Sequence, residues 1–161
     1  MPRTADWLAA ETDRLLDFGE SAALPAGGFG WLDAHGEVDP ARSPQLWINA
    51  RMTHGFALAH LLGRPRAAQL ADHGLAALRG PFKDHEFDGW FAADSDDPAA
   101  QRKDAYPHAF VVLAAASATV AGRPGADDLL AEALQVVDAH FWSEPDGACR
   151  ESWDRAWQTT E

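Results

Sequence analysis

The sequence has 161 residues, of which 47% are hydrophobic, so it can bury the core of one globular domain. Its 13 basic and 25 acidic residues give a net charge of -12, which opposes binding to nucleic acids and to anionic membrane surfaces. The longest nearly apolar run, residues 109–121, is shorter than the roughly 20 residues that span a bilayer, and the first residues show no secretory signal. We therefore expect a cytoplasmic protein without nucleic-acid or membrane partners.

Hydrophobic periodicity predicts five helices separated by long loops rich in Gly, Pro and Asp. Ser43 is a good N-cap for the second helix and Pro44 a good first residue, while Gly63 ends it. Asp104 is the expected cap of the fourth helix. The second and fourth helices are apolar nearly all round and should be buried, whereas the other three are amphipathic. The five expected helices span residues 4–18, 44–62, 65–78, 104–121 and 125–141, and a third long loop then ends the chain.

Repeated segments indicate how these helices are arranged. HGFALA at His54 and HAFVVLA at His108 stand 54 residues apart, and each leads through a Gly-Arg-Pro turn, at 63–65 and 122–124, into an amphipathic helix. Loops marked by Trp31, Trp90 and the region of Arg150 are spaced by 59 or 60 residues. Periods of this size are typical of solenoids and of closed rings of helical hairpins. We expect an all-α toroid with the apolar helices inside and the amphipathic helices outside.

The second helix carries one charged residue, Arg51, on a stripe otherwise formed by Trp47, Gly55, Leu58 and Leu62. Burying an unpaired guanidinium costs several kcal/mol, so Arg51 should meet a carboxylate, carbonyl groups or a polar ligand. A structural ion pair and a ligand-facing arginine both remain open at this point.

A toroid of this kind brings its long loops to one rim, around the N-terminal ends of the inner helices. Trp47, Asn49 and Arg51 lie in the first two turns of one inner helix, and Tyr106 and His108 take the same place on the next. The helix N-termini add partial positive charge there, which suits hydroxyl oxygens, carbonyl oxygens or a developing oxyanion. The rim is therefore the expected functional site.

Four segments resemble one family, the N-acylglucosamine 2-epimerase superfamily, and most closely its mannose isomerase and sulfoquinovose isomerase branch. They are LWINARMTHGFALAHLLG, DGWFAADSDD, KDAYPHAFVVLAAASATVAGRP and AHFWSEPDGACRESWDRAW, which are distributed over residues 44–157. The resemblance implies an (α/α)6 barrel of twelve helices that isomerises or epimerises sugars without a metal or nucleotide cofactor. It further implies that residues 1–161 are the N-terminal part of a single catalytic domain.

Carried over residue by residue, the resemblance implies that Trp47, Arg51 and Tyr106 line the sugar pocket and that Asn49 and His108 belong to the same motifs. The family's acid and base histidines lie on later inner helices, so no catalytic residue is expected within this chain. The chain should therefore need the remainder of the barrel or associate with itself. Its expected ligand is a monosaccharide.

The function implied by the resemblance is aldose-ketose isomerisation of the mannose to fructose type, with proton transfer through a cis-enediol. One alternative is a sugar 2-epimerase of the N-acylglucosamine or cellobiose type. Another is a non-catalytic helical-repeat module that binds a carbohydrate or a protein.

A metal site is not expected from the sequence. No HExxH motif occurs among the seven histidines, and His54 with His60 does not have the spacing of helical ligands. Cys149 is the sole cysteine, so it forms neither an intrachain disulfide nor a cysteine-based zinc site. The acidic loop at 94–97 lacks the spacing and the glutamate of an EF-hand and reads as solvated. We expect no cofactor.

Overall fold

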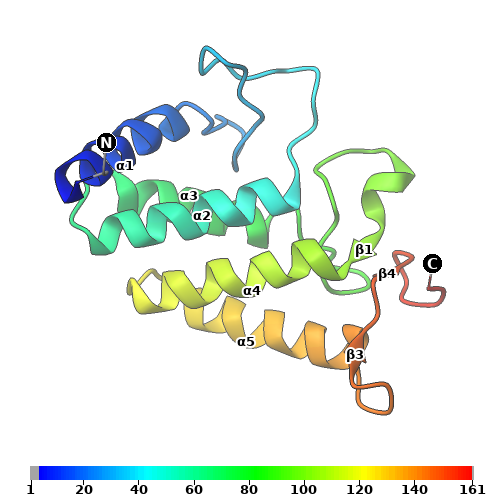
Figure 1. The fold of residues 1–161 in the computed structure, drawn as a ribbon. Helices are drawn as coiled ribbons and strands as arrows, with labels where there is room; N and C mark the ends of the chain where they lie inside the picture. The colour runs from blue at the N-terminus through cyan, green and yellow to red at the C-terminus, as the bar shows by residue number, and fades with distance from the viewer. Residues whose placement is uncertain (1–3, 161) are drawn as a thin grey trace.

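A computed structural model describes residues 4–160, and in it five helices form two layers (Figure 1). The inner layer holds α2 (Leu46–Leu61) beside α4 (Ala105–Val120). The outer layer holds α3 (Ala67–Arg79), which packs on α2, and α5 (Ala126–Val136), which packs on α4. The two-layer arrangement expected from the alternation of apolar and amphipathic helices is confirmed.

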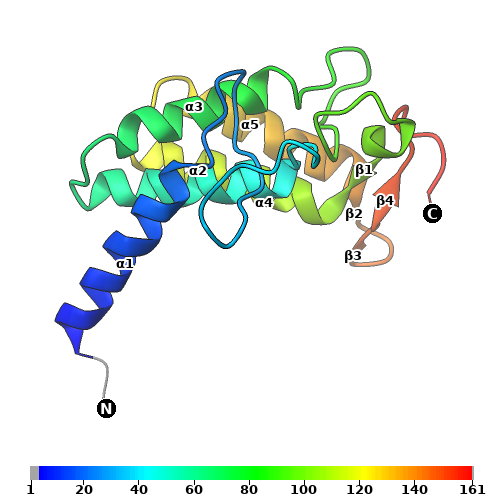
Figure 2. The same cartoon turned by 90° about the horizontal axis from the view of Figure 1, so that it is seen from above.

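The first helix, α1 (Ala5–Glu20), is capped by Thr4, whose side chain accepts a hydrogen bond from the backbone N–H of Trp7. Its N-terminal part runs away from the other helices (Figure 2). Large apolar side chains of α1 are consequently exposed, among them Leu8 at 52% and Leu15 at 54%. Among the described residues, no helix is long and apolar enough to cross a membrane.

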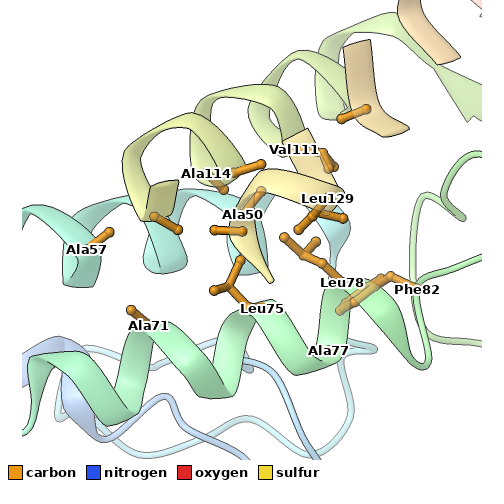
Figure 3. Packing of buried hydrophobic residues seen from close by; sticks show 14 of the residues in the cluster. Ala50, Ala57, Ala71, Leu75, Ala77, Leu78, Phe82, Val111, Ala114 and Leu129 are labelled. Carbon is orange, nitrogen blue, oxygen red and sulfur yellow. The ribbon is translucent and has the colours of Figure 1, made fainter. Parts of the chain in front are cut away.

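The core lies where the four packed helices meet (Figure 3). Alanines such as Ala50 and Ala114 let α2 and α4 approach closely, and Leu75, Leu78 and Leu129 fill the space toward the outer helices. At Gly74 the two backbones of α2 and α3 come so near that a Cβ atom would overlap the hydroxyl of Thr53.

The end of the expected fifth helix is π-helical, and the segment after residue 141, expected to be a plain loop, has regular structure. A π-helical turn extends α5, a short hairpin joins β2 to β3, and β4 runs antiparallel to β1 with Lys103 opposite Trp153. The short elements are a 3-10 turn (Pro98–Gln101), β1 (Lys103–Asp104), the π-helix (Val137–Phe141), β2 (Trp142–Ser143), β3 (Ala148–Cys149) and β4 (Ser152–Trp153).

The two helical hairpins repeat with an offset of 59 residues. Leu46 and Ala105 begin α2 and α4, Leu61 and Val120 end them, and the outer helices α3 and α5 begin at the same offset. The 54-residue match between His54 and His108 is therefore not a structural equivalence, and that expectation was wrong. His54 lies in the middle of α2, whereas His108 lies in the first turn of α4, because the two similar strings fall at different distances from the helix ends.

An ion pair repeats at the same offset. Arg64, in the first Gly-Arg-Pro turn, pairs with Asp13 of α1 at 2.6 Å. Arg123, in the second turn, pairs with Asp72 of α3 at 2.6 Å. The turn after α2 is thus bonded to α1, and the turn after α4 is bonded in the same way to α3. By this register α1 is an outer helix, equivalent to α3 and α5.

The N-terminal cap of α2 also differs from the expectation. The helix begins at Leu46 with Gln45 as the capping residue, not at Pro44 after Ser43. The backbone N–H of Leu46 donates to Ala92 O at 2.9 Å, and Gln45 pairs with Ala93 in an isolated bridge. Because the segment up to Gln45 is held extended against the second long loop, the helix starts two residues later.

Candidate functional site

A pocket of about 360 Å³ opens at the rim where α2 and α4 begin. Its wall combines two aromatic side chains with several polar and charged ones, and we call it the rim pocket. The lining residues are Gln45, Trp47, Ala92, Arg102, Asp104, Tyr106, Pro107 and Glu151.

Backbone hydrogen bonds hold three loops around this pocket. Leu46 N donates to Ala92 O at 2.9 Å, which joins the start of α2 to the second loop. Ala105 N donates to Glu151 O at 2.8 Å, and the pairing of β1 with β4 continues this contact. The first backbone N–H group of each inner helix therefore binds a loop carbonyl instead of a ligand. The bond from Ala105 also brings Glu151 to the mouth of the pocket.

Trp47 and Tyr106 face the same pocket from equivalent positions of the two inner helices, as expected. Tyr106 is 62% exposed, so its hydroxyl is free to bind a ligand. The indole of Trp47 meets the edge of Trp31 at 5.7 Å between ring centroids. Trp31 is itself held by its N–H bond to Ser43 O and by the guanidinium of Arg42, 3.4 Å from the ring centroid.

Arg51 lies one turn beyond Trp47 and does not line the rim pocket. Its guanidinium carbon is 5.6 Å from the centroid of Trp47 and 5.4 Å from that of Phe110. Within residues 4–160 it forms no hydrogen bond or ion pair, and the side chain is exposed. The expected carboxylate or carbonyl partner is thus absent from the described part of the chain, because this stripe of α2 faces an open edge instead of a packed core.

Asn49 is fully buried and does not reach the rim pocket. Its amide nitrogen donates to Gly74 O at 3.1 Å, which ties α2 to α3. Its carbonyl oxygen has no hydrogen-bond partner among the described residues. The structure therefore gives Asn49 a role in helix packing, not the expected contact with a ligand.

His108 takes the position in α4 that Asn49 takes in α2, and it is also buried. Its Nε2 accepts a hydrogen bond from Trp90 N at 3.1 Å, so Nδ1 carries the proton and donates to Asp104 O at 2.7 Å. Burial lowers the pKa of His108 to about 3. The ring is thus neutral, has both nitrogens engaged and lies away from the rim pocket, in contrast to the expected ligand contact.

A buried charge network supports the loops below the pocket. Lys103 and Asp84 are both fully buried and pair at 3.0 Å. Arg155 adds hydrogen bonds of 3.0 and 3.1 Å to the same carboxylate. Burial alone would raise the pKa of Asp84, but these bonds and those from two backbone amides lower it well below its usual value. Because Lys103 belongs to β1, the network fixes the strand that leads into α4.

The sequence drew attention to Trp47, Arg51 and Tyr106 but missed several polar residues of the rim pocket, including Gln45 and Arg102. Arg102 Nε donates to Asp104 at 2.8 Å, so these two charges form a pair at the mouth. Asp104 was expected as the cap of the fourth helix, but no residue pattern marks Gln45 and Arg102, because loop folding, not helical periodicity, brings them to the pocket. In the described part of the chain, no three His, Cys, Asp or Glu side chains converge as metal ligands would.

A family profile described as N-acylglucosamine 2-epimerase (GlcNAc 2-epimerase) matches residues 27–161. The chain belongs to this family. Curated relatives include a D-mannose isomerase of Thermobifida fusca, 57% identical over 157 residues, which are 96% of this chain and 39% of that protein. A D-mannose isomerase of Pseudomonas cannabina pv. alisalensis is 48% identical over 160 residues, 99% of this chain and 38% of that protein.

Solved structures of two other proteins share this fold. A D-mannose isomerase superposes with a TM-score of 0.89 at 22% identity, covering 99% of this chain and 43% of that one. Cellobiose 2-epimerase from Spirochaeta thermophila superposes with a TM-score of 0.83 at 23% identity, covering 96% and 41%. The fold is therefore that of the N-terminal part of an (α/α)6 barrel, as expected. The chain spans about two fifths of the length of the curated relatives it matches.

Proposed function

We propose that the rim pocket is part of the active site of a sugar aldose-ketose isomerase, of the type that interconverts mannose and fructose. The observation that carries the proposal is the 57% identity to a D-mannose isomerase over nearly the whole of this chain. The pocket suits a neutral monosaccharide because an indole can pack on the apolar face of a sugar ring while a phenol and charged groups bind hydroxyls.

In this proposal each of the five expected site residues has a role that its observed position allows. Trp47 packs against the sugar, and the exposed hydroxyl of Tyr106 donates to or accepts from a sugar hydroxyl. Arg51, which has no ion pair within the described residues, orients hydroxyls or stabilises the negative charge of an enediolate. Asn49 and His108 act indirectly: Asn49 ties α2 to α3, and His108 holds the loop that precedes β1.

The reaction itself needs a base that removes the proton from C2 and returns it to C1, while a proton moves between O1 and O2. His108 is unsuited to this task because it is buried and neutral, with both ring nitrogens bonded. We therefore assign the acid and base to the rest of a barrel, of which residues 1–161 form the N-terminal part of a single catalytic domain. The cytoplasmic location expected from the sequence belongs to the same proposal.

The test uses a polypeptide that contains residues 1–161 and has the full length of the curated relatives, which we call the full-length polypeptide. It should interconvert mannose and fructose after treatment with EDTA and dialysis, and in heavy water deuterium should enter the product at C1. A hydride shift assisted by a metal would leave C1 without deuterium and would stop with the chelator. Loss of activity with EDTA, its return with a divalent ion and an unlabelled C1 would together overturn the proton-transfer mechanism.

Sugar 2-epimerisation is the second candidate, because structures of cellobiose 2-epimerases share the fold at TM-scores of 0.80 and 0.83. The same heavy-water experiment separates the two, since an epimerase places deuterium at C2 of an aldose product. A polypeptide that binds sugars but produces neither fructose nor a 2-epimer would instead favour the non-catalytic binding module.

Replacing Arg51 tests whether that side chain faces the ligand. In the full-length polypeptide Arg51→Ala should leave the fold intact and lower kcat/KM by about 100-fold or more, since a charged hydrogen bond to the transition state is lost. Arg66→Ala, which removes an exposed arginine paired with Glu20 at 3.2 Å, is the matched control and should leave kcat/KM unchanged. Loss of folded Arg51→Ala protein, with the surviving molecules fully active, would assign Arg51 a structural role.

A further inference from the structure

Phe110 joins two of the proposed sugar-binding residues that come from different helices. Its ring stands at 81° to the ring of Tyr106, one turn earlier on α4, with 5.0 Å between centroids. On α2, the guanidinium carbon of Arg51 lies 5.4 Å from the Phe110 centroid. Phe110 is half-buried, so it belongs neither to the closed core nor to the free surface.

The contact with Arg51 matters because little else in the described residues restrains that side chain. Its guanidinium has two aromatic neighbours, Trp47 and Phe110, and forms no hydrogen bond or ion pair within residues 4–160. A cation beside aromatic rings is attracted to their negative faces, which restricts the rotamers of a long side chain. The edge-on contact restricts the ring of Tyr106 in the same way.

We propose that Phe110 is a positioning residue, which sets the relative placement of Arg51 and Tyr106 at the boundary between α2 and α4. This inference rests on the proposed function of those two residues. The Phe110 side chain has no polar atom that could bind a sugar hydroxyl, and its ring contacts both Arg51 and Tyr106, so we assign it a role through these two neighbours.

The internal repeat supports a role that goes beyond filling space. Phe110 occupies the position in α4 that Arg51 occupies in α2, because the two residues are 59 positions apart. The cation of α2 therefore contacts an aromatic ring at the equivalent position of α4. Any apolar side chain of similar volume would fill this half-buried position. An aromatic ring, in contrast, is required to attract the guanidinium and to meet Tyr106 edge to face.

The test compares three variants in the full-length polypeptide. Phe110→Leu removes the ring and keeps most of the volume, and it should lower kcat/KM for mannose by about 10- to 100-fold, because small misplacements of binding groups have effects of this size. Phe110→Tyr keeps the ring and should retain the wild-type value within about threefold. Phe87→Leu is the matched control, because Phe87 also lies beside an arginine, with 5.1 Å between its ring centroid and the guanidinium carbon of Arg155, but is not among the ring contacts of Arg51 or Tyr106 in the described residues and does not line the rim pocket.

A second measurement, on residues 1–161, does not depend on activity. The Nε–Hε proton signal of Arg51 in an NMR spectrum should move downfield in Phe110→Leu, because the ring current of Phe110 is lost, and should stay near its wild-type place in Phe110→Tyr and Phe87→Leu. An unmoved Arg51 signal in Phe110→Leu would overturn the proposal whatever the activity. A moved signal with wild-type kcat/KM would also overturn it. If the wild-type polypeptide turns over no sugar, the proposed function fails, and the NMR result alone then decides the role of Phe110.

Discussion

At the scale of single residues, the buried imidazole of His108 makes the fold sensitive to acid. In the folded protein its pKa is lowered to about 3, whereas in an unfolded chain a histidine titrates near 6.5. Between these two values the unfolded chain binds a proton that the folded protein does not bind. The free energy of unfolding therefore falls as the pH falls through this window, by about 1.4 kcal/mol per pH unit.

The fall of the free energy of unfolding with falling pH should be smaller in His108→Gln. A glutamine can accept the hydrogen bond from Trp90 N and donate to Asp104 O without titrating, so the variant should lose less stability than the wild type between pH 7 and pH 5. Urea denaturation at several pH values measures this slope, for which we expect a difference of about 2 kcal/mol over the two units.

The matched control is His85→Gln, which changes an exposed loop histidine and should keep the wild-type slope. Equal slopes in His108→Gln and the wild type would mean that His108 is accessible to protons in the folded protein. Asp84, whose pKa is also lowered, contributes to acid sensitivity at lower pH, below the range of this comparison.

How much of the site could be predicted depended on where each side chain lay along its helix. Trp47 and Tyr106 were expected at the rim because both follow the start of an apolar helix, and the structure does bring them into one pocket. Asn49 and His108 lie in the same motifs but turn into the packing between layers. Periodicity places a residue on a helix face, yet it does not say which face meets another helix and which remains open.

At the scale of elements, two glycines in the middle of helices allow opposite predictions. Around Gly55 of α2 there is open space, so Gly55→Ala should stabilise the chain by about 0.5–1 kcal/mol through better helix propensity. At Gly74 of α3 an added methyl group would overlap the hydroxyl of Thr53, so Gly74→Ala should destabilise by about 1–3 kcal/mol. Thermal or urea denaturation of residues 1–161 measures both changes.

These two variants are controls for each other, because both replace a glycine inside a helix by alanine. Equal effects would contradict the close approach of α2 and α3 at Gly74. The counterpart of Gly55 at the 59-residue offset is Ala114, a buried alanine, so the methyl group should also be tolerated when this edge of α2 is covered.

The helices themselves were predictable because their signals are local. Apolar periodicity and the Gly-Arg-Pro turns located all five within a few residues of their observed bounds. The first residue of α2 and the structure after Phe141 could not be predicted from such local signals. Leu46 begins its helix where a loop distant in sequence accepts its N–H, and β4 forms because Lys103 and Trp153 meet across almost fifty residues.

At the scale of the whole molecule, the space between α1 and α2 matches a filled space elsewhere in the fold. A pocket of about 230 Å³ lies between these two helices. Each of its lining residues has a counterpart at the 59-residue offset that is buried or half-buried in the packing of α2 on α3 and α4. The lining residues are Thr12, Leu15, Leu16, Gly19, Arg51, Met52, Gly55 and Phe56, and their counterparts are Ala71, Gly74, Leu75, Leu78, Phe110, Val111, Ala114 and Ala115.

The pocket between α1 and α2 therefore has the shape of a site for another inner helix. Such a helix would pack on α1 and α2 as α2 packs on α3 and α4. In the described residues no helix occupies that place, and the apolar side chains of α1 are exposed beside it. A contiguous exposed apolar face of this kind favours association.

We accordingly expect residues 1–161 by themselves to associate in solution. Sedimentation velocity should show a weight-average mass that rises with concentration, above the 17.4 kDa of one chain. Leu15→Glu places a charge on the apolar side of α1 and should reduce this association strongly, because burying an unpaired carboxylate is costly. Ala10→Glu, at the position equivalent to the exposed Gln69 of α3, adds the same charge elsewhere on α1 and should leave association unchanged. A stable monomer at all concentrations would instead mean that α1 folds back over the pocket between α1 and α2 and covers its apolar side chains.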